Sequence, residues 1–220
     1  MDPNIQIRFF QTHDRAIIRA ICCAAADRGG AVEGIFPDKE IAADFLTAYY
    51  TDYEPQSCLV AVFDGDVVGY LTGCVDNRRY GLLMGSYLLP KILVCAFFRG
   101  ALFRPEFWSL AQAAFKNWRR WFSWRRDSFH SHQGHLHIGI SETFRHKGIG
   151  EQLVNAFLNH ARRSAVSQLE ASVHQGNVFG CRFFERMGFY VAHRHHMWMA
   201  RGSKFEQYQA FNYVKDVSNT

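Results

Sequence analysis

The run Arg145-His146-Lys147-Gly148-Ile149-Gly150 has the composition of a binding site for an anionic group. It follows an apolar strand pattern that ends at Ile140 and leads into a helical pattern. Backbone N–H groups at a helix N-terminus point to one place, and the helix dipole favours negative charge there. The glycines remove Cβ atoms that would keep a pyrophosphate away, and Arg145 and Lys147 add positive charge. The run therefore predicts a pyrophosphate cradle, with a purely structural loop before a helix as the alternative.

The elements around this run predict one α/β (α+β) domain over residues 1–220, since 220 residues with 48% hydrophobic content suit one core. Residues 5–72 read as strand, helix, helix and two strands, with a hairpin turn at Asp64-Gly65. Residues 134–200 read as strand, helix, strand, short helix and strand, and the tail reads as a last strand. Between these halves, residues 77–133 read as two or three amphipathic helices inserted into the domain.

A wider pattern appears downstream of the cradle, where Asn177 precedes the run Phe183-Phe184-Glu185-Arg186-Met187-Gly188-Phe189. Together with Arg-x-x-Gly-x-Gly, these residues resemble the GNAT superfamily of acetyl-coenzyme A dependent N-acetyltransferases, over about residues 5–76 and 134–200. The inserted form resembles the acetyltransferase-like domain of O-GlcNAc hydrolases. The resemblance implies the GNAT fold, a twisted, mixed and mostly antiparallel sheet of about seven strands flanked by helices.

The resemblance also implies residues that hold the co-substrate, acetyl-coenzyme A. The loop amides from Arg145 through Gly150, with Glu151, would bind its pyrophosphate. The strand Ile138-Gly139-Ile140 would pair with its pantetheine arm, and Asn177 would contact it. Gly139 suits a bulge or a close backbone approach where the central strands part.

Phe184 departs from the family pattern, because many members have a tyrosine there that protonates the departing thiolate. Phe184 can only pack in the coenzyme site, and Tyr190 or Tyr70 are alternatives for the hydroxyl. Two functions follow. One is transfer of the acetyl group to an amine of a small molecule or protein, and the other is a catalytically degenerate module that binds acetyl-coenzyme A or a partner.

The candidate base is His137, with His135 beside it on the same strand face. An imidazole pKa near neutrality suits removal of a proton from an ammonium group. The alternative is that both histidines are partly buried residues bonded to their neighbours. Glu170, unless it faces solvent, and Ser172 are other candidates on the neighbouring strand.

The inserted segment carries most of the positive charge. Residues 78–126 hold ten Lys or Arg against the single acid Glu106, so this segment has a net charge of +9 and the rest of the chain −4. One interpretation is that this segment binds an acidic or aromatic acceptor. The other is that its basic residues form a solvated face while its aromatic residues pack the helices onto the sheet. A third interpretation is contact with nucleic acid or with an anionic membrane. Of these two, we expect at most a peripheral contact with a membrane. Pro90, Lys91 and Arg99 interrupt the apolar run before the roughly 20 residues of a membrane span.

Two groups of histidines raise the possibility of a metal site, but neither has cysteine or carboxylate ligands at suitable spacing, so we expect no metal. The groups are His130, His132, His135 and His137, and His193, His195 and His196. The first residues lack the basic head of a signal peptide, which favours a cytoplasmic protein. A monomer and a homodimer are both compatible with the sequence.

Overall fold

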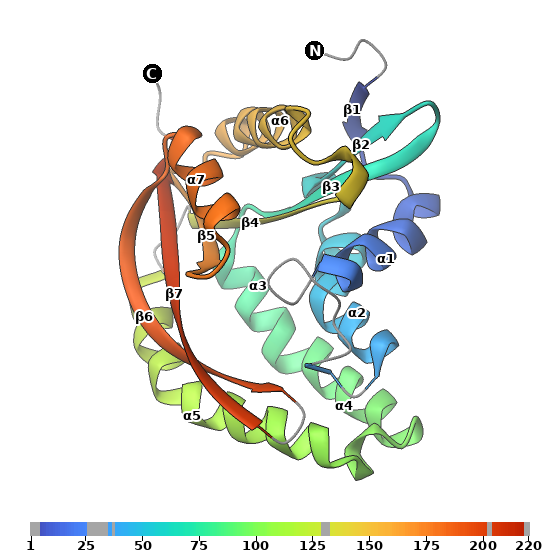
Figure 1. Ribbon diagram of the computed structural model, residues 1–220, viewed down its shortest axis with the longest axis vertical. Helices are drawn as coiled ribbons and strands as arrows, with labels where there is room; N and C mark the ends of the chain where they lie inside the picture. The colour runs from blue at the N-terminus through green and yellow to red at the C-terminus, as the bar shows by residue number, and fades with distance from the viewer. Residues whose placement is uncertain (1–4, 26–34, 37, 129–132, 202–203, 218–220) are drawn as a thin grey trace.

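The computed structural model describes residues 5–25, 35–36, 38–128, 133–201 and 204–217, without the side chains of 118–128 and 204. One seven-stranded sheet runs through the molecule in the order β1-β2-β3-β4-β5-β7-β6 (Figure 1). Among the strands of the described residues, only the β4–β5 pair is parallel, which confirms the predicted mixed and mostly antiparallel sheet. The strands are β1 Ile5–Phe9, β2 Cys58–Phe63, β3 Asp66–Cys74, β4 Gln133–Ile140, β5 Gln168–His174, β6 Tyr190–Arg201 and β7 Lys204–Asp216.

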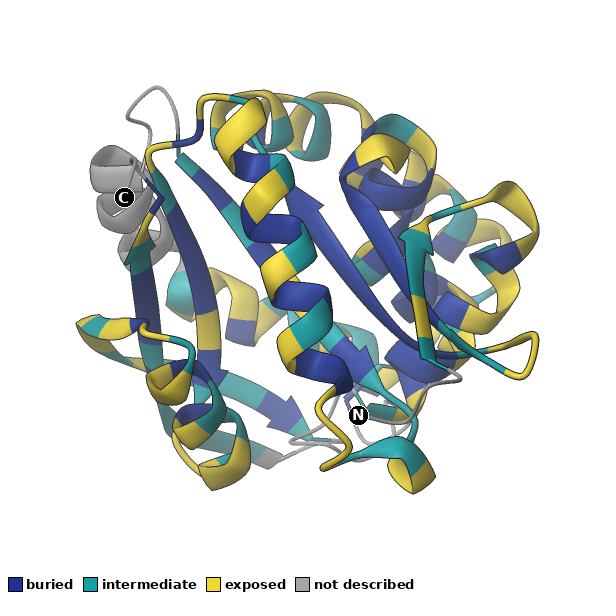
Figure 2. Cartoon of the chain, turned by 90° about the horizontal axis from the view of Figure 1, so that it is seen from above, coloured by how far each residue is buried: buried dark blue, intermediate teal, exposed yellow. Residues whose placement is uncertain are grey.

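The helices lie on both sides of this sheet. They are α1 Arg15–Ala25, α2 Lys39–Ala48, α3 Asn77–Leu83, α4 Leu89–Phe98, α5 Pro105–Ser128, α6 Ile149–Arg163 and α7 Val178–Arg186. The helices α6 and α7 cover one face, whereas α1, α2 and the inserted helices lie toward the other (Figure 1). Buried residues concentrate on the central strands and on the sheet-facing sides of the helices (Figure 2).

Local signals in the N-terminal half produce the predicted elements. Asp38 caps α2, because its Oδ1 accepts from the amides of Glu40 and Ile41 at 2.9 and 3.1 Å. The β2–β3 turn places Asp64 at φ 49° and Gly65 at φ 89°, as the hairpin prediction required.

The main core lies between the sheet and α6. Leu153 and Phe157 of α6 pack with Leu136 of β4 and Leu169 of β5, all with essentially no exposed surface. Because this cluster contains residues from both central strands, it fixes where α6 begins. The first turn of α6 is thereby held beside the end of β4.

The described part of the inserted segment consists mainly of two long helical stretches. The helices α3 and α4 join through a π-helical turn, Met84–Leu88, into one helix from Asn77 to Phe98. In that turn the amide of Leu89 donates to the carbonyl of Met84, five residues back. This shift lets Pro90, which has no N–H, continue the helix.

Length and composition would allow this helix to cross a membrane, since it has 22 residues, a mean hydropathy of 1.7 and only 17% burial over its most apolar window. Pro90 and Lys91 therefore lie inside the helix, which ends just before Arg99. The next helix, α5, returns along the β6–β7 hairpin (Figure 1). Asn117 fixes it there, because its side chain bonds both the N–H and the C=O of Trp198, at 2.9 and 2.8 Å.

Candidate functional site

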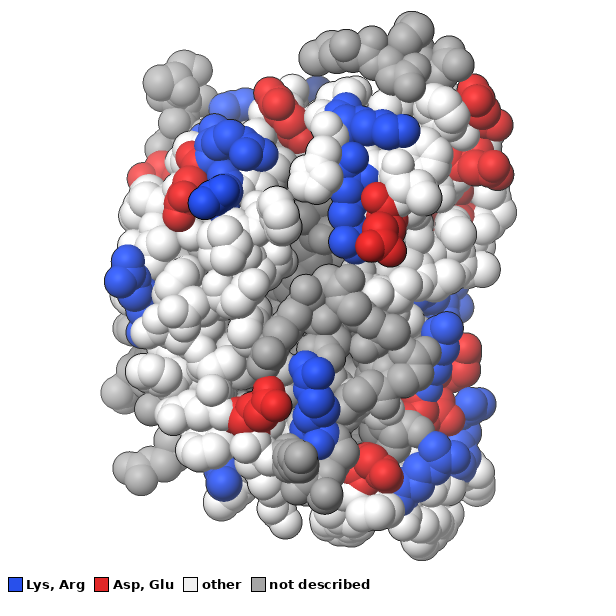
Figure 3. Space-filling view, viewed as in Figure 1, with Lys and Arg blue, Asp and Glu red and all other residues white. Residues whose placement is uncertain are grey.

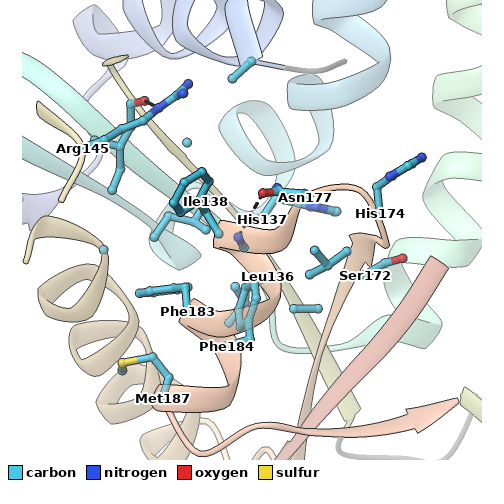
Figure 4. A pocket seen from close by; sticks show the side chains of 18 of the residues that line it. Leu136, His137, Ile138, Arg145, Ser172, His174, Asn177, Phe183, Phe184 and Met187 are labelled. Carbon is cyan, nitrogen blue, oxygen red and sulfur yellow. Dashed lines mark hydrogen bonds between the residues drawn. The ribbon is translucent and has the colours of Figure 1, made fainter. Parts of the chain in front are cut away.

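A cavity opens where β4 and β5 part. Their pairing spans three residues and ends at His135 opposite Glu170. Beyond that point, residues 136–140 of β4 and residues 171–174 of β5 form the walls of a cavity of about 1210 Å³ (Figure 4). In the part of the chain that the structure describes, no strand pairs with the cavity-side edge of β4 from Leu136 onward. An extended chain can therefore add to this edge by backbone hydrogen bonds.

The predicted cradle closes one end of this cavity. Gly148 lies at φ 77° and caps α6, and His146 lies at φ 64°. Within the described residues, no backbone carbonyl accepts from the amides of residues 146–151. A Cβ added to Gly148 would meet no atom within 4 Å, so the space in front of these amides is open. This geometry fits a pyrophosphate.

The positive charge at the cradle differs in part from the prediction. Arg145 lines the cavity, and its Nε donates to the carbonyl of Ile140 at 3.3 Å. Lys147 points elsewhere, with its Nζ 4.7 Å from the centre of the Phe144 ring. Instead, Arg182 and Arg186 of α7 line the cavity. Their spacing of four residues on one helix was the signal for them in the sequence. In Figure 3, Lys and Arg side chains flank the hollow in the upper part of this face.

Asn177 lines the cavity from the start of α7. Its Oδ1 accepts from the amide of Gly180 at 2.9 Å, so the side chain caps the helix (Figure 4). This bond holds the carbonyl end of the side chain and leaves its NH₂ group for other partners. Ile149, Gly150 and Glu151 also line the cavity, at the first turn of α6.

Gly139 serves a close approach and not a bulge. The β3–β4 register is regular from Gly69–Ile140 to Cys74–His135, so of the two predicted alternatives the bulge is not formed in this pairing. A Cβ at Gly139 would lie 2.5 Å from Cε1 of Tyr70, because the Tyr70 ring lies over this residue. Glycine at 139 thus lets a phenol pack across β4, next to Ile138, at the wall of the cavity.

Phe184 packs at the floor of the cavity, as its apolar ring requires. It is 5% exposed and stacks on Tyr213 with ring centroids 5.9 Å apart. Of the two tyrosines considered for the missing hydroxyl, Tyr70 lines the cavity and Tyr190 does not. Tyr208 of β7 also lines it and stacks on His174 at 4.6 Å, a contact that the sequence pattern did not reveal.

His135 is held in one tautomer and does not line the cavity. Its Nδ1 donates to Oδ1 of Asn77 at 2.6 Å, because an amide oxygen can only accept. Its Nε2 then accepts from the Tyr50 hydroxyl at 2.7 Å. Burial, with a contribution from His137, lowers the pKa of His135 to about 3. Both nitrogens are occupied, so the alternative of a bonded, buried histidine describes His135.

His137 lines the cavity, and its ring centre lies 5.5 Å from that of His135 and 5.8 Å from that of Tyr50 (Figure 4). His137 is an exposed residue whose side chain is open to solvent through the cavity, with the atoms of the cavity walls around it. This desolvation lowers the pKa of His137 to about 4, below the value near neutrality that we predicted. At neutral pH His137 is therefore uncharged and can accept a proton.

The two candidates on β5 differ. Glu170 is 8% exposed and does not line the cavity, which corrects the reading that it faces solvent. Ser172 lies two residues further, where the strands have parted, and it is exposed to the cavity. The distance between the strands therefore decides which of the two is accessible.

The histidine groups remain separate in the fold. His135 and His137 lie on β4, and His193, His195 and His196 lie on β6, with β5 and β7 between them. His130 and His132 lie outside the described residues. Among the described residues, no three His, Cys, Asp or Glu side chains are grouped so that they could hold a metal ion.

Comparisons with known proteins agree with this geometry. Residues 107–189 match the model of the acetyltransferase (GNAT) family. A search of curated proteins found no match. Solved structures share the fold. SsHAT has a TM-score of 0.72 and 20% identity over 99% of this chain and 100% of its own.

Two further solved structures share the fold. The putative acetyltransferase yncA from Salmonella typhimurium, solved with its cofactor acetyl-CoA, has a TM-score of 0.59 and 16% identity over 99% of this chain and 96% of its own. An N-acetyltransferase from Staphylococcus aureus Mu50 has a TM-score of 0.61 and 16% identity over 98% of this chain and 99% of its own. At these identities the likenesses show the fold.

Proposed function

We propose that this chain, whose residues 107–189 match the acetyltransferase (GNAT) family, transfers the acetyl group of acetyl-CoA to an amine acceptor. The observation that carries the proposal is the cavity between β4 and β5, with six amides at one end and His137 on its wall. These features suit a ligand with a pyrophosphate, an extended amide-containing arm and a reactive end.

We assign the binding of acetyl-CoA mainly to backbone groups of the cavity. The amides of residues 146–151 would hold the pyrophosphate, with Arg145 beside them. The open edge of β4, residues 136–140, would pair with the amides of the pantetheine arm. Bound in this way, acetyl-CoA supplies an activated thioester at the point where β4 and β5 part. The cradle and the open edge lie on the same cavity, so one ligand can use both.

His137 is the proposed base. Transfer forms an N–C bond and breaks the C–S bond, while the amine loses a proton and the sulfur gains one. An imidazole nitrogen of His137 would accept the amine proton and pass it to water, since a pKa of about 4 does not retain it. His135 would position His137, because its own nitrogens are engaged by Asn77 and Tyr50.

The proton for the sulfur has no donor at Phe184, which supports the second candidate function. A module that binds acetyl-CoA without transfer needs the cradle and the β4 edge but no acid. Tyr70 is the phenol on the cavity wall nearest to β4, with its hydroxyl 3.0 Å from the Cβ position at Gly139. For the function in which the acetyl group is transferred, we assign to Tyr70 the role of the acid that protonates the sulfur.

Calorimetric titration with acetyl-CoA, combined with thiol release across a panel of amines, tests both functions. We expect binding and acceptor-dependent thiol release. Binding without release for every acceptor would support the module, and no binding would refute both functions.

A pair of variants tests the base. His137→Ala should lower kcat by about 10²–10⁴-fold with little change in acetyl-CoA affinity. The control is His13→Ala, at a side chain that is 72% exposed and away from the cavity. An unchanged kcat for His137→Ala would remove His137 from this role.

A further inference from the structure

The helix Asn77–Phe98 presents an apolar side to solvent. Leu89, Leu93 and Phe97 are four positions apart, as are Val94 and Phe98, so these residues lie on one side of the helix. We call these residues, with Phe103 of the following turn, the outer face: Leu82, Leu89, Leu93, Val94, Phe97, Phe98 and Phe103. All are at least 41% exposed, and Phe98 and Phe103 reach 81% and 74%. Large contiguous apolar surface of this kind marks an interaction site in a folded protein.

The opposite side of the same helix is part of the protein core. Leu88 packs with Tyr49, Tyr50 and Cys58, and Ile92 packs with Ile41 of α2. A helix that crosses a bilayer would expose its whole circumference to lipid or to other spans. This helix cannot do so without leaving the core. It can lie in the plane of a membrane surface with only the outer face in contact, as interfacial helices do.

The segment that carries the outer face is rich in positive charge, and the acids Asp38, Glu40 and Asp44 at α2 lie near one end of it, at Arg99. Residues 77–117 contain six Lys or Arg and one acid, Glu106. Five of the six basic residues belong to the helix or to the turn after it: Arg78, Arg79, Lys91, Arg99 and Arg104, all of them exposed. Asp38 bonds one of them, Arg99, at 3.0 Å. Aromatic and basic side chains together match the boundary between lipid head groups and acyl chains.

We propose that the outer face docks this protein onto the surface of an anionic lipid bilayer. The charge argues for lipid over a second copy of the chain, because a two-fold contact through this face would bring its basic residues against each other. An anionic surface instead complements them. Phe97, Phe98 and Phe103 form one contact group, with ring centroids 5.5 and 5.9 Å from that of Phe97, and they would enter the acyl boundary.

Vesicle flotation of the full chain tests this proposal, with phosphatidylcholine vesicles with and without phosphatidylserine. We expect the protein to float with the anionic vesicles, less with the neutral ones, and less as salt increases. The variant Phe97→Ser/Phe98→Ser/Phe103→Ser should weaken binding to anionic vesicles by at least about tenfold. The matched control is Phe9→Ser/Tyr190→Ser, two rings exposed by 50% and 51% on β1 and β6.

Every outcome bears on the proposal. Thermal unfolding and acetyl-CoA binding verify that both variants are folded, since none of these residues lines the cavity. Absence of flotation with anionic vesicles, or equal loss in the two variants, would overturn it. A dimer of the natural chain that the triple variant abolishes, in solution without lipid, would assign the outer face to a second copy and also overturn it.

Discussion

Replacement of Gly148 by alanine separates two effects at the cradle. Gly148 lies at φ 77°, where a side chain costs about 1–2 kcal/mol of backbone strain. The added Cβ would meet no protein atom within 4 Å, so it adds no clash and points into open space. If this space is where the pyrophosphate lies, the Cβ keeps the anion from the amides of residues 146–151.

The expected magnitudes follow from this geometry. The variant should lose about 1–2 kcal/mol of unfolding free energy, or a few degrees in Tm for a chain of this size. The loss of one charge-assisted hydrogen bond costs about 1.5–3 kcal/mol, so the Kd for acetyl-CoA should rise by about 10- to 100-fold. Urea unfolding and calorimetry measure the two quantities.

Gly65 provides the matched control. It lies at φ 89° in the β2–β3 turn, again with no atom within 4 Å of an added Cβ, and it does not line the cavity. Gly65→Ala should lose similar stability and keep its affinity for acetyl-CoA. Unchanged affinity in Gly148→Ala, or equal losses of affinity in both variants, would refute the cradle.

Three further predictions concern titrating groups. Unfolding free energy should fall as pH drops below about 6.5, by up to about 1.4 kcal/mol per pH unit for His135, because its pKa of about 3 in the folded chain means that only the unfolded chain protonates it there. His137 is exposed to the cavity, so solvent screening makes its contribution smaller. Urea unfolding at stepped pH should show this slope and not a flat profile. Asn77→Asp places a carboxylate where an oxygen lies 2.6 Å from Nδ1 of His135, so the pKa of His135 should rise from about 3 in an NMR titration and the acid loss should shrink. Asp14→Asn should cost about 2 kcal/mol at pH 7. Burial raises the pKa of Asp14, but the Arg8 bonds at 2.7 and 2.8 Å outweigh this effect and hold the pKa below its usual value. The difference in unfolding free energy between the variant and the natural chain should therefore narrow as acid protonates Asp14.

The cradle could be predicted from the sequence because its determinants are local. Arg145 through Gly150 are contiguous, and the strand before them and the helix after them each carry their own periodicity. The hairpin at Asp64-Gly65 was predictable for the same reason. The sheet order required more than local signals, and the resemblance to a family supplied it.

The environment of the histidines could not be predicted, because its partners are distant in sequence. Asn77 and Tyr50 lie 58 and 85 residues from His135, and both arrive through packing of helices that flank the sheet. The same packing desolvates His137 and lowers its pKa. The continuation of the helix through Pro90 was also missed, since a π-helical turn leaves no marked sequence pattern.

The short pairing between β4 and β5 affects how rigid the sheet is. Three residue pairs connect the part of the sheet that contains β1 to β4 with the part that contains β5 to β7. On the side of α6 a shared core joins these parts, but from Leu136 onward the described residues show no strand pairing between β4 and β5. A ligand that pairs with β4 and contacts β5 would link the two strands across this gap. Binding of a ligand in the cavity should therefore make this part of the sheet more rigid without a change of fold. Amide hydrogen exchange at residues 136–140 should then be slower.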